Sequence, residues 1–137
     1  MNSNLLLNCY LSLLEKNYAP QFKGEHIIFR YNNSLFIEVS RNHTKKYSCF
    51  FSIPNVISTE KKNKAVISRF IEETYSEVCN PVRIRIEKDE TVTIYLISST
   101  AFSDSSDRHN HIDYFCDVLA ETYDVFIEMV IRRYGEE

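Results

Sequence analysis

The segment VRIRIEKDETVTIYL, residues 82–96, contains two runs in which apolar and polar residues alternate, separated by a polar turn at residues 88–90. The alternating apolar positions are Val82, Ile84, Ile86, Val92, Ile94 and Leu96. Successive side chains of a strand point to opposite faces, so this period predicts two strands, each with one buried and one polar face. The short polar turn between them favours an antiparallel hairpin.

Upstream of this hairpin, runs rich in β-branched and aromatic residues predict three further strands, at residues 26–31, 34–40 and 47–53. Helical periodicity predicts one helix at residues 5–14, a second between Thr59 and Asn80, and a third whose apolar stripe runs from Ile112 to Val130. Residues 101–110 are predicted as a polar loop. The expected fold is therefore a single α+β domain over residues 1–137, in the order α-β-β-β-α-β-β-α, because strands in runs exclude a doubly wound parallel sheet.

Composition narrows the functional classes. The formal net charge of -3 argues against a dedicated nucleic-acid binder, which needs a dense positive surface. No apolar run approaches the roughly 18 residues of a membrane span, and two glycines leave no Gly-rich phosphate loop. The four cysteines are widely spaced, which is typical of reduced thiols and predicts a cytoplasmic protein.

The residues His109, His111 and Asp113 are of the types that could hold a metal in a hydrolase. The other histidines, His26 and His43, lie far away in the sequence, so the cluster is interpreted as a polar loop that leads into the last helix. Cys116 lies nearby but falls on an apolar helical stripe, where a buried structural role is expected. We therefore expect no catalytic residue, no metal site, no cofactor and no enzyme; a metal-dependent hydrolase is the third-ranked alternative.

Two sets of strand residues are candidates for partner binding. Phe36 and Phe50, together with Tyr31, are expected on the side of the first sheet opposite the main core, either under a helix or in a binding patch. Arg83 and Arg85 should share the polar face of the hairpin with Tyr95. That second set supports the alternative function, a nucleic-acid or small-ligand binding domain.

The middle helix has more apolar positions than one narrow stripe can hold. Besides Ile67 and Ile71, it carries Val66, Phe70 and Tyr75. A sheet covers only one face of a helix, so the surplus predicts an interface, and a two-fold homodimer is the commonest closed solution.

Three stretches carry a resemblance to a known family: GEHIIFRYNNSLFIEV at residues 24–39, FSIPNV at 51–56 and VRIRI at 82–86. Together with the element order, they resemble the YbjN-type, type III secretion chaperone-like proteins. The resemblance implies helices packed on one curved antiparallel sheet, in small acidic proteins that are often homodimeric and non-enzymatic. It supports a protein-binding module, chaperone-like or regulatory, whose partner is another protein or a peptide segment.

Overall fold

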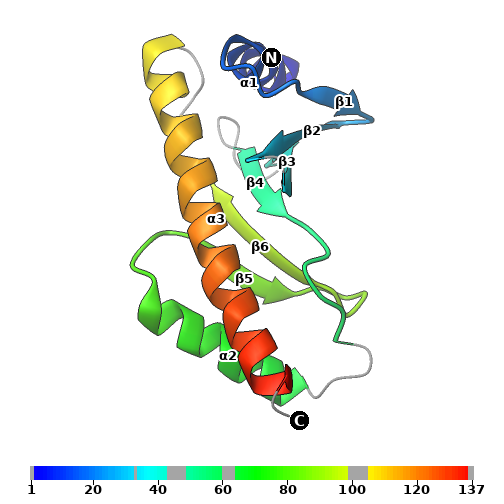
Figure 1. Ribbon diagram of the computed structural model, residues 1–137. Coiled ribbons are helices and arrows are strands. Elements are labelled where there is room, and N and C mark those ends of the chain that lie inside the picture. Colours follow the sequence, from blue (N-terminus) through cyan, green and yellow to red (C-terminus); the bar gives the residue numbers. More distant parts are fainter. Residues whose placement is uncertain (1, 33, 43–48, 60–63, 99–104, 136–137) are drawn as a thin grey trace.

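The computed structural model describes residues 2–32, 34–42, 49–59, 64–98 and 105–135 (Figure 1). Three helices and six strands follow one another as α1 (Asn2–Glu15), β1 (Gln21–Lys23), β2 (His26–Tyr31), β3 (Leu35–Arg41), β4 (Cys49–Ile53), α2 (Lys64–Glu77), β5 (Arg83–Ile86), β6 (Val92–Ile97) and α3 (Ser105–Gly135). The predicted α+β order is confirmed, with one short strand added after α1. No helix among the described residues is both long and apolar enough to cross a membrane.

The added strand, β1, lies between the first predicted helix and the first predicted strand. It has three residues, too few to show a period, and all three are exposed. It forms a hairpin with β2 across a two-residue turn, where Gly24 has a φ of +65°. Glycine takes this left-handed conformation without a steric cost, which is why a tight hairpin can form there.

The last helix begins earlier than predicted. Residues 105–110 belong to α3, although they were expected to be a polar loop. Their sequence has no apolar stripe, so periodicity could not reveal them. A helix that is already nucleated gains one hydrogen bond for each added residue, and a polar extension of a long helix therefore costs little. Residues 101–104, the rest of the predicted loop, lie outside the described residues.

All the strand pairs are antiparallel, and the sheet order is β1-β2-β3-β4-β6-β5. The predicted hairpin of residues 82–96 is confirmed, with Ile84 opposite Ile94. It joins the first meander through β6, which pairs with β4 so that Phe51 lies opposite Leu96. The two predicted groups of strands thus form one sheet, as the resemblance implied, and β5 lies at its edge.

The core lies between one face of this sheet and the helices. Phe29, Phe51 and Leu96 are buried on the sheet side, and Leu119 and Phe126 are buried on α3. Figure 1 shows α3 running along the sheet, with α1 beside one end of α3 and α2 beside the other. Because α1 contacts β3 and α3 contacts β4 and β6, the helices leave the opposite face of the sheet without a layer of its own among the described residues.

Candidate functional site

The face of the sheet that points away from the helices is called the open face here. The strand registers and the alternation of burial assign to it Lys23, Ile28, Arg30, Phe36, Glu38, Phe50, Arg83, Arg85, Tyr95 and Ile97. Phe36 is 55% exposed and Ile97 is 48% exposed. Large apolar side chains gathered on one uncovered face are a common mark of a binding surface.

The aromatic rings of the open face are held by cations and by one another. The guanidinium carbon of Arg30 lies 4.7 Å from the centre of the Phe36 ring, and that of Arg85 lies 4.6 Å from the centre of the Tyr95 ring. The ring centres of Phe50 and Tyr95 are 6.1 Å apart. Such cation–π contacts fix the orientation of the arginines and cover one face of each ring.

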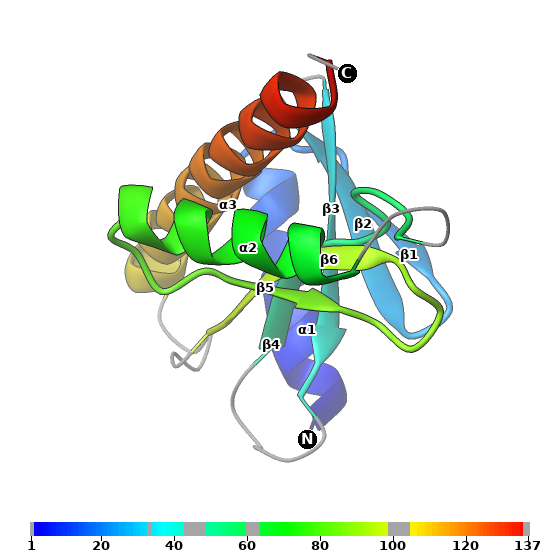
Figure 2. The same cartoon turned by 90° about the horizontal axis from the view of Figure 1, so that it is seen from below.

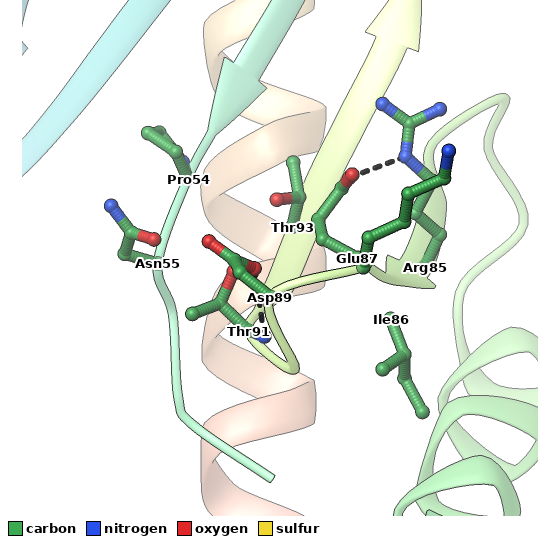
Figure 3. A pocket seen from close by; sticks show the side chains of 9 residues that line it. Pro54, Asn55, Arg85, Ile86, Glu87, Asp89, Thr91 and Thr93 are labelled. Atoms are coloured by element: carbon green, nitrogen blue, oxygen red, sulfur yellow. Dashed lines mark hydrogen bonds and ion pairs between the residues drawn. The ribbon is translucent and has the colours of Figure 1, made fainter. Parts of the chain in front are cut away.

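Two hollows on this side of the molecule meet at Pro54. The smaller, about 270 Å³, is lined by Ile28, Phe36 and Glu38 among others. The larger, about 730 Å³, is bordered by Arg85, Thr93 and the tip of the β5–β6 hairpin (Figure 3). The first combines apolar side chains with the charged Lys23 and Glu38, and the second is lined mainly by polar and charged side chains, so the open face offers two chemically different recesses next to each other.

The predicted basic set is partly neutralised within the protein. Arg83, Arg85 and Tyr95 do share the open face, as predicted. However, Nε of Arg85 donates a hydrogen bond to Glu87, which raises the pKa of this arginine (Figure 3). Arg83 donates to the carbonyl of Val82 and lies toward Tyr75 of α2.

Tyr31 was expected on the same side as Phe36 and Phe50, and this expectation is wrong. The register places Tyr31 opposite Leu35, on the helix side of the sheet. There its hydroxyl donates a hydrogen bond to Asp117 of α3. Burial, followed by this hydrogen bond, raises the pKa of Tyr31 to about 12, so the phenol stays protonated and ties β2 to α3.

The middle helix has less uncovered apolar surface than predicted. Phe70 is only 3% exposed and belongs to the core of the single chain, so it presents little surface to a partner. Val66 is half-buried. Tyr75 is engaged too, because its hydroxyl accepts a hydrogen bond from the amide of Ile84 at 2.7 Å and donates one to the carbonyl of Ile84 at 3.1 Å. Figure 2 shows α2 lying along the hairpin that contains β5, whose outer edge Tyr75 therefore closes.

The first helix has an uncovered apolar face that the sequence pattern did not separate from its buried face. Leu7, Leu11 and Leu14 are 45%, 41% and 44% exposed. These three residues, called the leucine face of α1, recur at the helical spacing i, i+4 and i+7. The buried side is instead formed by Leu5, Leu6, Cys9, Ser12 and Leu13.

Asp113, one of the three residues considered as metal ligands, instead connects α3 to the segment that follows α1. Nζ of Lys16 lies 2.8 Å from a carboxylate oxygen of Asp113, and the Tyr18 hydroxyl donates to the other oxygen at 3.0 Å. Burial raises the pKa of the neighbouring Cys116 thiol far above its ordinary value, which does not suit a nucleophile. The side chain of His109 lies outside the described residues. Among those that are described, no group of three potential ligands could hold a metal ion.

Sequence reasoning identified Phe36, Phe50 and Tyr95 but missed Ile28, Arg30 and Ile97 on the same face. Alternation within a strand puts residues on one of two faces. It does not say which face meets the helices, nor which residues of neighbouring strands are paired. Arg30 is paired with Phe36 across the β2–β3 hairpin, and this pairing is the signal that could have found it.

Comparisons with known proteins bear on the fold. No family model and no curated protein matches the chain. A crystal structure of YbjN from E. coli, a candidate transcription regulator, is similar over 93% of each chain, with a TM-score of 0.65 and 8% sequence identity. The Yersinia pestis type III secretion chaperone SycH, in complex with a stable fragment of YscM2, is similar over 82% of this chain and 97% of its own, with a TM-score of 0.43 and 10% identity. The predicted resemblance is thus confirmed as a likeness of structure, and the chain shares the fold of YbjN.

Proposed function

We propose that this protein is a non-catalytic protein-binding module, chaperone-like or regulatory, and that the open face of its sheet is the binding surface. One observation carries the proposal: Phe36 and Ile97 are about half exposed on a sheet face that no helix among the described residues covers. Burying such side chains against a partner is favourable by about 25 cal/mol for each Å² of apolar surface removed from water.

A nucleic-acid or small-ligand binding domain is the second candidate, supported by the shared position of Arg83, Arg85 and Tyr95. Three features favour a protein partner. The net charge is negative, Arg85 is already hydrogen-bonded to Glu87, and one face of the Tyr95 ring is covered by Arg85 rather than free for a base. The aliphatic side chains of the open face, Ile28 and Ile97, also suit apolar protein side chains better than bases.

We also propose a homodimer in the cytoplasm. Since Phe70 is buried and Tyr75 closes a sheet edge, the leucine face of α1 is the better candidate interface, and a two-fold axis would pair it with itself. Light scattering during size exclusion tests the dimer: a mass of 16.2 kDa that stays the same at tenfold higher concentration would contradict it.

The proposed cytoplasmic location is supported by the free thiols, three of them buried, which fit a reducing compartment.

Affinity capture from the native cell, followed by mass spectrometry, tests the binding function. The tagged wild-type chain is compared with a Phe36→Asp/Ile97→Asp variant and with Ile131→Asp, in which the changed residue is an apolar side chain 65% exposed on α3. We expect at least one protein that is retained by the wild type and by Ile131→Asp but lost from the double variant. Equal recovery by all three folded proteins would contradict the use of the open face.

A further inference from the structure

The strand residues of the open face carry more positive than negative charge, whereas the whole chain has a negative net charge. The protein has a formal net charge of -3, but the strand residues of this face include the cations Lys23, Arg30, Arg83 and Arg85 and one carboxylate, Glu38. The Oε1 atom of that carboxylate lies 3.1 Å from Nδ1 of His26, within hydrogen-bond distance. The strand residues of the open face therefore carry more positive than negative charge in an otherwise acidic protein, and the carboxylates of Glu87 and Asp89 lie at the hairpin tip beside Arg85.

Three of these cations, Lys23, Arg30 and Arg83, have no acidic partner within the described part of the chain. Among those residues no carboxylate forms an ion pair with Lys23 or Arg30; Lys23 lines the smaller hollow, and the Arg30 guanidinium rests on the ring of Phe36. At the other end of the sheet, Arg85 directs Nε to Glu87 and its guanidinium lies over the Tyr95 ring, and a group with five N–H donors has donors beyond these contacts. Both ends of the open face can thus receive a carboxylate.

From this arrangement we infer that the partner of the open face is an acidic segment whose apolar residues occupy the surface between Arg30 and Arg85. The inference rests on the proposed protein-binding function and specifies its partner. Charge complementarity of this kind selects the partner and its register more than it adds affinity.

The geometry of the sheet sets the spacing of the acidic residues. From β2 to β5 there are four steps between neighbouring strands, and strands lie about 4.8 Å apart, so the two cationic ends are separated by about 19 Å. An extended segment advances about 3.3 Å per residue, and its side chains alternate between two sides. Acidic residues at i and i+6, with apolar residues at i+2 and i+4, would therefore reach both cations and lie over Phe36 and Pro54, which line the hollows between them.

A defined probe tests the inference without the natural partner. We would measure the binding of a dye-labelled peptide with Glu at i and i+6 and Leu at i+2 and i+4, spaced by Ser, by fluorescence anisotropy. The same peptide with Lys in place of Glu, a peptide with Ser in place of Leu, and single-stranded oligothymidylate are measured beside it. We expect the Glu/Leu peptide to bind most tightly, with an affinity that falls as salt is added.

Charge reversal on the protein provides the decisive variants. The Arg30→Glu/Arg85→Glu variant should bind the acidic peptide about tenfold or more weakly than the wild type and should bind the Lys peptide more tightly. Arg132→Glu, on the exposed surface of α3, should leave both affinities unchanged. Lys23→Glu, at an exposed position of β1, should act in the same direction if the double variant does not fold.

Equal binding of the Glu and Lys peptides to the wild-type protein would overturn the inference. Oligothymidylate that binds more tightly than the acidic peptide, and is lost in the charge-reversed variant, would also overturn it and would assign the face to nucleic acid. The capture experiment keeps the two claims apart. If a partner still depends on Phe36 and Ile97 while the peptides show no charge preference, only the acidic partner is refuted; if no partner depends on them, the protein-binding function fails as well.

Discussion

Removing the hydroxyl of Tyr75 should lower the stability of the protein, because this hydroxyl is hydrogen-bonded to the edge strand β5. In the Tyr75→Phe variant, the amide and carbonyl of Ile84 lose the hydroxyl that now bonds both of them, at 2.7 and 3.1 Å. Ile84 is only 6% exposed, so water has limited access to replace these bonds. The ring itself is kept, together with its contact with the Arg83 guanidinium, and the effect therefore isolates the hydrogen bonds.

The size of the effect follows from the two lost bonds. Each contributes about 1 kcal/mol to the free energy of unfolding, so the variant should lose about 2 kcal/mol. The entropy of unfolding is about 2.1 cal/mol/K per residue, and for 137 residues this loss corresponds to a fall in Tm of about 7 °C.

Urea unfolding followed by circular dichroism measures this loss. Tyr114→Phe is the matched control, because it removes the same hydroxyl from a ring that is 48% exposed, and it should change stability by less than about 0.5 kcal/mol. If Tyr75→Phe were as mild as the control, the hydroxyl would not close the β5 edge, and this edge would be available for pairing with another strand.

Three further predictions concern the core and the thiols. Phe115→Ala should lower the free energy of unfolding by about 3–5 kcal/mol, measured by urea unfolding. The ring is 7% exposed, and its centre lies 5.0 Å from that of the Phe51 ring. A loss below about 1 kcal/mol would show that Phe115 of α3 is not packed against the sheet. Burial raises the pKa of the Cys49 thiol from 9.0 to about 12, so its contribution to stability is complete below about pH 9 and is lost as the pH rises toward 12. The free energy of unfolding should therefore fall over this range, and less steeply in Cys49→Ala; an identical slope in the two proteins would refute this account. A thiol reagent at pH 8 should modify the exposed Cys79 first and the three buried thiols only on unfolding, whereas rapid modification of all four in the native protein would contradict the packing.

Local pattern was enough to predict the strands and helices whose period is clear. The hairpin at residues 82–96 and the element order follow from alternation and amphipathicity, which are properties of a few neighbouring residues. The short strand β1 and the polar first turns of α3 have no such period. They form because a Gly24 turn and an existing helix extend structure into them.

The site was less accessible to prediction because it depends on contacts between distant segments. Phe36 and Phe50 were placed on the open face by alternation, but the same reasoning misplaced Tyr31, since nothing local says which face of β2 meets α3. Likewise, Phe70 was expected at an interface because its burial against the rest of the chain is invisible in the helix pattern. A hydrophobic stripe predicts that its residues are buried, but it does not identify which other segments of the chain, or which partner, cover them.

The central claim, that the open face receives a protein partner, can be tested most directly by photo-crosslinking in the native cell. A photoreactive phenylalanine analogue is placed at position 36 or 97 on the open face, at position 11 on the leucine face of α1, and at the exposed control position 131 of α3. The account predicts that positions 36 and 97 give the same crosslinked protein, that position 11 gives a crosslinked dimer of this chain, and that position 131 gives neither. A partner crosslinked from position 131 or 11 but not from 36 or 97 would contradict it.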